Sequence, residues 1–147
     1  MHDLAFSPDG RTVAAAREDK RVALYDAENG KERPQTGQAD GAVLVVKWAP
    51  DGQRLYSAGA DARLTEWSDS GARSFATTRG QITALDVSSE WVATGSNGEV
   101  HLWNRETGAL WAEIPADAGR VAAVHFIDAH ALFAIGADRV PHLWQIR

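Results

Sequence analysis

Short apolar segments separated by polar turns follow one another along the chain, and their layout repeats. Four segments consist of a polar turn followed by an apolar stretch that ends on an aromatic residue: REDKRVALYD, GADARLTEWS, GSNGEVHLWN and GADRVPHLWQ. In each of them an Asp or Asn precedes the aromatic residue by six positions, giving the pairs Asp19 and Tyr25, Asp61 and Trp67, Asn97 and Trp103, Asp138 and Trp144. A spacing kept four times indicates a structural repeat.

Each repeat contains further strand-like segments around this motif. Two apolar segments precede the turn, as in LAFSPDGRTVAAA and VVKWAPDGQRLYSA. SPDG and APDG join them with the chemistry of a tight hairpin turn, because Pro fixes φ, Asp bonds its own backbone and Gly accepts a positive φ. A more polar outer strand is expected at 31–33, 73–77 and 111–114. The aromatic residues recur at steps of 42, 36 and 41 residues, and a period near 40 built from short strands is typical of propeller blades.

The repeat predicts an all-β fold, a β-propeller with about four blades of four antiparallel strands. The expected blades are approximately 1–37, 38–78, 79–117 and 118–147. The chain opens inside a strand and HLWQIR ends on a third strand, so we expect the propeller to be incomplete at both ends. Uncovered blade faces and strand edges favour association. The chain is therefore expected to be a fragment of a longer propeller, or half of an assembly in which two chains form an eight-bladed ring.

The same segments resemble the WD-repeat family. The dipeptides that end the third strands are Tyr25-Asp26, Trp67-Ser68, Trp103-Asn104 and Trp144-Gln145. The Gly-His pair that the family often carries before the first strand is absent. The resemblance therefore implies only a partial version of the family's hydrogen-bond network, formed by Ser57, Trp67 and Asp61 in the second repeat and by Thr94, Trp103 and Asn97 in the third. The tryptophans at repeated positions, 48, 67, 103 and 144, are expected in the core, and those at 91 and 111 partly exposed.

Composition excludes several classes of partner. The chain of 147 residues has no cysteine, so it forms neither disulfides nor thiolate zinc sites, which fits a cytoplasmic setting. The net charge is −5 and the basic residues are scattered, so no nucleic-acid partner is expected. The longest apolar run, 42–46, is far shorter than the roughly 20 residues that span a bilayer, so no membrane partner is expected.

Residues capable of catalysis or metal binding do not form a known motif. His101 and His142 occupy the same place in two repeats, and His125 lies five residues before His130 without a further close ligand. Ser96, in GSNG, lacks the G-x-S-x-G pattern, and no phosphate-binding or calcium loop is present. We therefore expect no enzymatic activity, no catalytic or metal-binding residues and no cofactor.

The sequence favours a non-catalytic scaffold that binds a protein or peptide through its loops. The candidate partner-binding residues are charged loop residues: Arg17, Glu18, Asp40, Arg63, Arg79 and Arg120. One alternative is an enzymatic, ligand-binding or metal-binding propeller that uses polar residues of the first strands in a central channel: His2, Asp3, Lys47, Asp86 and His125. Another is a sensor segment of a larger signalling protein.

Overall fold

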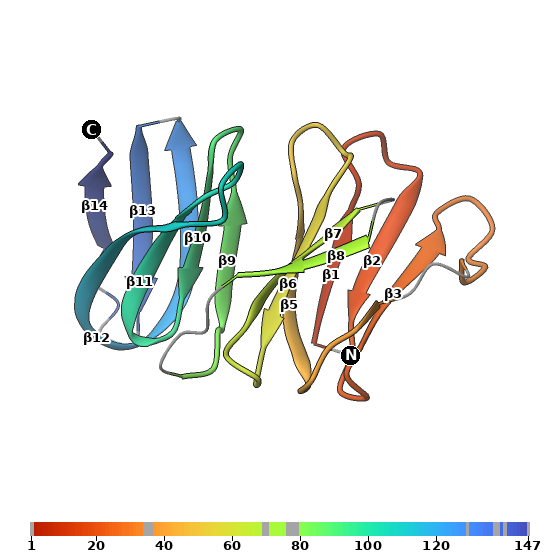
Figure 1. Ribbon diagram of the computed structural model, residues 1–147, viewed down its shortest axis with the longest axis horizontal. Coiled ribbons are helices and arrows are strands. Elements are labelled where there is room, and N and C mark those ends of the chain that lie inside the picture. Colours follow the sequence, from red (N-terminus) through yellow and green to blue (C-terminus); the bar gives the residue numbers. More distant parts are fainter. Residues whose placement is uncertain are drawn as a thin grey trace.

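The computed structural model describes residues 2–33, 37–68, 71–75, 80–128, 130–136, 139 and 141–146, with only the backbone at 116–119. This part of the chain forms β-strands and turns and contains no helix, so it has no helix that could cross a membrane. The strands gather into antiparallel sheets that stand side by side along the long axis of the molecule (Figure 1). The fold is an arc of propeller blades, as the repeat predicted.

The first two blades are separate four-stranded sheets with strands in sequence order. Blade 1 consists of β1 (Asp3–Phe6), β2 (Thr12–Ala16), β3 (Arg21–Asp26) and β4 (Gly37–Gln38). Blade 2 consists of β5 (Val43–Trp48), β6 (Leu55–Gly59), β7 (Leu64–Ser68) and β8 (Gly71–Ser74). In both blades consecutive strands pair in antiparallel orientation.

The third and fourth blades share one long strand and form a continuous sheet of six strands. This sheet contains β9 (Ala84–Val87), β10 (Trp91–Gly95), β11 (Asn97–Asn104), β12 (Leu110–Asp128), β13 (Ala131–Gly136) and β14 (Pro141–Gln145). The first part of β12 pairs with β11 as the outer strand of blade 3, and its second part pairs with β13 as the inner strand of blade 4. The expected boundary between 117 and 118 therefore lies within a strand.

The hairpins between the first and second strands of blades 1 and 2 are made by the Pro-Asp-Gly turns. Asp9 accepts hydrogen bonds from the Ser7 hydroxyl (2.5 Å) and from the Arg11 backbone N–H (3.0 Å). These two bonds stabilise the carboxylate and lower the pKa of Asp9 below its ordinary value. Gly10 and Gly52 both have φ of +72°, the left-handed conformation that favours glycine. The turn chemistry read from the sequence is thus present in the structure.

The outer strands depart most from the expected positions. In blade 1 the expected strand at 31–33 is reduced to an isolated bridge between Tyr25 and Glu32, and β4 lies farther along at Gly37–Gln38. The polar, turn-forming sequence of this region explains the difference, because it offers few side chains that favour an extended, packed strand.

The strand register defines the two faces of each blade. In every blade one row of side chains joins the aromatic residue of the third strand to an opposite residue on the second strand and another on the first. These rows are Tyr25–Val13–Phe6, Trp67–Leu55–Trp48, Trp103–Val92–Val87 and Trp144–Leu132–Phe126. In blades 2 to 4 residues of this row pack against the blade before, so we call this side the preceding face and the other side the following face.

Three apolar clusters fill the spaces between successive blades. Between blades 1 and 2, Val46 and Leu55 pack against Ala14, Ala16 and Val22. The other two clusters pair the preceding face of blade 3 with the following face of blade 2, and the preceding face of blade 4 with the following face of blade 3. The core is thus divided into inter-blade layers, as expected of a propeller, in which blades pack face to face.

Among the tryptophans of the first and third strands, Trp103 alone is fully buried, with 0% of its surface exposed. Trp48, Trp67 and Trp144 are half-buried, so the expectation that all four lie in the core is only partly met. Trp48 and Trp67 line a cavity of about 500 Å³ between blades 1 and 2, which leaves part of each ring accessible. Trp111 is 51% exposed and packs edge-on against Trp91, as the irregular spacing of these two suggested.

Candidate interaction surface

One edge of the arc collects the turns after the second strands and the segments that enter the first strands. We call this the upper edge, although it faces downward in the view of Figure 1. It comprises residues 17–20, 39–42, 60–63, 96–97 and 120. Backbone hydrogen bonds fix neighbouring parts of the edge, with Val43 N donating to Arg17 O (3.0 Å) and Val121 N donating to Ser96 O (3.0 Å). The edge is therefore held in a defined shape by the blades beneath it.

The candidate residues of blade 1 pair with their neighbours. The Arg17 guanidinium forms an ion pair with Asp19 (2.8 Å) and donates a hydrogen bond to the Tyr25 hydroxyl (3.4 Å). Its bond to Tyr25 and the charge of Asp19 raise the pKa of Arg17 above its ordinary value. Glu18 pairs with His2. These side chains form a local polar network at the end of the arc.

In blade 2 the turn residue Asp61 connects two segments of the upper edge. Its carboxylate accepts hydrogen bonds from Arg63 N (3.1 Å) within its own turn and from Asp40 N (3.3 Å) in the segment that enters β5. The side chains of Arg63 and Asp40 pair directly at 2.7 Å. Two candidate residues are thus brought together by a third residue that the repeat had singled out for its position.

Replacing Asp61 by alanine is expected to lower the free energy of unfolding by about 1 kcal/mol, because two partly exposed backbone N–H groups lose their acceptor. Urea midpoints of the variant and the parent measure this loss. Asp19→Ala is the matched control. The Asp19 side chain accepts from one described backbone N–H, that of Arg21 (3.3 Å), and its exposed ion pair with Arg17 contributes little, so we expect a smaller loss. Equal losses would contradict the bridging role of Asp61.

The predicted tryptophan networks form only in part. Trp67 donates its indole N–H to Ser57 (2.7 Å), and Trp103 donates to Thr94 (3.0 Å). Asp61 instead joins the upper edge as described. The Asn97 side chain makes no hydrogen bond to other described residues, and the turn there is closed by Ser96 N donating to Glu99 O (2.9 Å).

Arg120 lies beside a hollow where the inner strands of all four blades meet the upper edge. The hollow has a volume of about 400 Å³ and is lined mainly by His2, Asp3, Leu44, Val45, Thr83, Leu85, Arg120 and Val124. Arg120 is exposed, and its side chain has no hydrogen bond or ion pair to any residue that the structure describes. An exposed guanidinium at the mouth of a partly apolar hollow can bind a carboxylate in two-point geometry.

Two predicted residues fall outside the described part of the chain: Arg79, a candidate partner-binding residue, and Asp138, the turn residue of the fourth repeat. Trp144, the partner of Asp138 in the repeat, is half-buried on β14.

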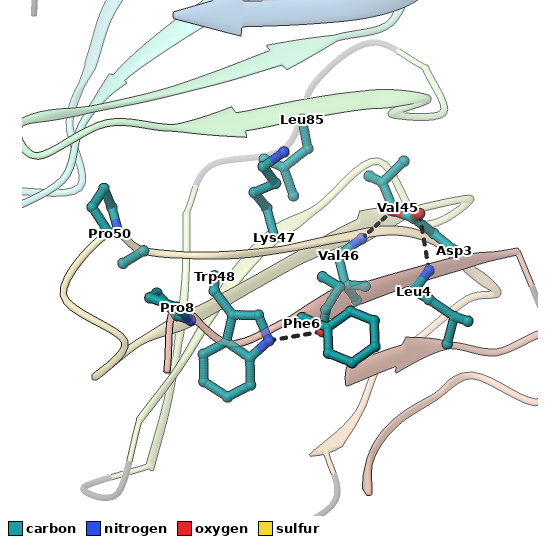
Figure 2. A pocket seen from close by; sticks show the side chains of 12 residues that line it. Asp3, Leu4, Phe6, Pro8, Val45, Val46, Lys47, Trp48, Pro50 and Leu85 are labelled. Atoms are coloured by element: carbon teal, nitrogen blue, oxygen red, sulfur yellow. Dashed lines mark hydrogen bonds between the residues drawn. The ribbon is translucent and has the colours of Figure 1, made fainter. Parts of the chain in front are cut away.

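A second hollow of about 310 Å³ lies lower along the inner strands of blades 1 and 2 (Figure 2). Figure 2 shows Asp3 and Trp48 holding these strands together, since Val46 N donates to Asp3 (3.1 Å) and the Trp48 indole N–H donates to Ala5 O (3.0 Å). Lys47 points from the same strand toward Leu85 of blade 3. The polar groups in this hollow therefore join blades to one another.

The first-strand residues proposed for a channel site also make contacts between or within blades. The buried Asp86 accepts a hydrogen bond from Phe126 N (2.7 Å) and pairs with Lys47 (3.7 Å) and His125 (3.3 Å). Asp86 thereby connects strands of three blades. Within the described residues, no group of three or more His, Asp or Glu side chains is placed to hold a metal ion.

The sequence did not single out Arg105, which lies buried at the opposite, lower edge between blades 2 and 3. Its guanidinium donates to the Tyr56 hydroxyl (3.1 Å), to Ser88 O and Ser89 O (both 3.1 Å), and to Asp51 (3.2 Å). Tyr56 in turn donates to Glu66 (2.5 Å). We call Arg105, Tyr56, Glu66 and Asp51 the Arg105 network.

The electrostatics of the Arg105 network follow from burial and pairing. Burial, together with the bond to Glu66, raises the pKa of the Tyr56 hydroxyl to about 12. Burial alone lowers the pKa of Arg105, but its bonds to Tyr56 and Asp51 outweigh this and raise it. The Gln53 N–H and then Arg105 lower the pKa of Asp51. Arg105 and Asp51 therefore stay charged and paired with each other across the neutral range, while Tyr56 stays a neutral hydrogen-bond donor.

Comparisons with known proteins match this chain to WD-repeat models and to WD-repeat proteins. Residues 1–51 match the anaphase-promoting complex subunit 4 WD40 domain, and residues 72–104 match the WD domain, G-beta repeat. The periodic tryptophan protein 2 homolog of Dictyostelium discoideum is 27% identical over 157 residues, covering 99% of this chain and 17% of the relative. WD repeat-containing protein 1 of Gallus gallus is 36% identical over 76 residues, covering 50% of this chain and 12% of the relative.

The chain thus spans less than one fifth of the length of these curated relatives. Among solved structures, the crystal structure of the computationally designed Ika4 protein superimposes with a TM-score of 0.86 at 21% identity, covering 98% of this chain and 89% of that one. This likeness supports the arrangement of the blades. The repeats in the sequence and the matches to WD40 models and WD-repeat relatives together show that the chain belongs to the WD-repeat β-propeller family.

Proposed function

We propose that the chain is a non-catalytic scaffold whose upper edge binds a protein or peptide partner. The observation that carries this proposal is Arg120, an exposed guanidinium with no partner among the described residues, beside a hollow lined by the inner strands of four blades. Most other charged candidates on this edge form ion pairs with neighbouring side chains. The guanidinium of Arg120 is therefore the group on this edge that is most available to a partner. The chemistry favours a partner segment that presents an acidic side chain next to an apolar one.

The contacts of the first-strand carboxylates support a scaffold over a catalytic channel. Asp3 and Asp86 each accept from a backbone N–H of the next blade, a structural use of both groups. We further propose that the blades run approximately 1–37, 38–78, 79–117 and 118–147. The uncovered end faces associate with further blades, which come from a second copy or from a larger propeller. The protein acts in the cytoplasm. A sensor role within a larger signalling protein is compatible with the same scaffold.

Reversing the charge of Arg120 tests the proposal. Peptides selected from a random displayed library against the parent chain are titrated into the parent and into Arg120→Glu by calorimetry. We expect the acidic binders to lose roughly tenfold or more in affinity, because a paired charge becomes a repulsive one.

Arg11→Glu is the matched control, since Arg11 is an exposed arginine in a turn at the lower edge. This variant should bind the selected peptides as the parent does. Unchanged affinity of Arg120→Glu, or an equal loss in Arg11→Glu, would contradict a binding site on the upper edge.

A further inference from the structure

The two end faces of the arc expose the side chains that every internal blade buries. On the preceding face of blade 1, Leu4 and Phe6 are 52% and 66% exposed. Their equivalents in the next blade, Val46 and Trp48, pack against blade 1. The uncovered preceding face of blade 1 therefore carries apolar side chains at the same positions as the preceding faces of blades 2 to 4, which are covered inside the arc.

The following face of blade 4 is also mainly apolar. Its row consists of Leu143, Phe133 and His125, which correspond by strand register to Leu102, Ala93 and Asp86 of blade 3. Leu143 is 60% exposed, whereas Leu102 is buried against blade 4. Ile127, farther along β12, is 58% exposed.

These two faces lie at opposite ends of the long axis, with β1–β3 at one end and β13–β14 at the other (Figure 1). They cannot meet within one copy of the chain. The following face of one copy, however, is built to receive the preceding face of another, because this is the pairing that occurs at the three internal interfaces.

Charge does not oppose this pairing. The interface between blades 2 and 3 needs Arg105 because blade 2 presents Tyr56 and Glu66 on its following face. At the same positions blade 4 presents Phe133 and Leu143, and blade 1 carries Ala27 in the position of Arg105. Both end faces are thus apolar at the positions of Tyr56, Glu66 and Arg105, and the polar member of the blade 4 row, His125, pairs with Asp86 of blade 3 (3.3 Å).

We infer that two copies of this chain associate head to tail through both end faces and close an eight-bladed ring. Two copies contribute four blades each, and eight blades lie within the range that propellers adopt. Contacts between different faces form a closed assembly when the rotation completes a full turn, and an open one otherwise. The inference rests on the proposed scaffold function, because the ring would place two upper edges around one channel.

Light scattering coupled to size exclusion tests the ring. We expect the parent chain at micromolar concentration to have twice the mass of one chain. Phe6→Glu and Leu143→Glu should each weaken association by roughly 30-fold or more, because each places a charge in both interfaces of the ring. Leu110→Glu, at an exposed apolar position on the outer part of β12, is the control and should remain dimeric.

Mixing the two interface variants distinguishes head-to-tail pairing from other dimers. A 1:1 mixture retains one unaltered interface, formed by blade 4 of Phe6→Glu and blade 1 of Leu143→Glu, and should therefore form heterodimers. Circular dichroism checks that each variant keeps its strands, which the exposure of both side chains favours. A monomeric parent, larger open oligomers, or dimers disrupted by only one substitution would overturn the inference. A monomeric parent chain that still binds the selected peptides would overturn the ring and leave the proposed scaffold function intact.

Discussion

Trp103→Ala is expected to lower the free energy of unfolding by about 3–5 kcal/mol, the range for deleting a large aromatic side chain from a core. The Trp103 ring is completely buried between blades 2 and 3 and packs edge-on against Phe75 at 5.8 Å. Its loss leaves a cavity and removes the indole donor from the hydroxyl of Thr94, which is also fully buried. Urea unfolding monitored by circular dichroism measures the effect.

Trp111→Ala is the control for the same chemical change on the surface. Half of Trp111 is already exposed, and its described ring contact is with Trp91 at 5.4 Å. We expect a loss of about 1 kcal/mol, because little apolar surface leaves the core. Equal losses for the two variants would show that Trp103 does not occupy the core position assigned to it.

Arg105→Ala is expected to cost about 2–4 kcal/mol, because it removes one partner from a buried polar network and leaves the others without it. The Tyr56 hydroxyl, Ser88 O and Ser89 O lose a charged donor, and the ion pair with Asp51 is lost. Chemical denaturation at pH 7 measures the loss, with Arg11→Ala as the exposed control.

A second variant separates the loss of hydrogen bonds from the loss of side-chain volume. Arg105→Met keeps most of the aliphatic length but cannot donate hydrogen bonds, so its loss should remain close to that of Arg105→Ala. Near-parental stability of Arg105→Met would show that Arg105 stabilises the interface through packing and not through hydrogen bonds.

The fold was predictable because its determinants are local and repeated. The Pro-Asp-Gly turns, the constant turn-to-aromatic spacing and the apolar strands each specify a hairpin without reference to distant residues. The outer strand of blade 1 was misplaced, because a polar segment next to a turn carries no periodic signal for its pairing partner.

The candidate site was less predictable, because its geometry depends on contacts between blades. Asp61, Arg63 and Asp40 were each identified from the sequence, but their mutual hydrogen bonds arise only when the upper edge is assembled. Arg105 was missed because its equivalents in the other repeats are Ala27, Asp69 and Ile146, so no recurrent residue type marks the position. Alignment of the repeats could have identified it as the one arginine two residues after the aromatic residue of a third strand.

Hydrogen exchange measured by mass spectrometry, with and without a selected acidic peptide, tests the central claim most directly. If the upper edge is the binding surface, the peptide will slow exchange at 17–20, 39–42, 60–63 and around Arg120, and leave the lower turns 7–11, 49–54 and 105–109 unchanged. Protection confined to the lower turns would contradict the account.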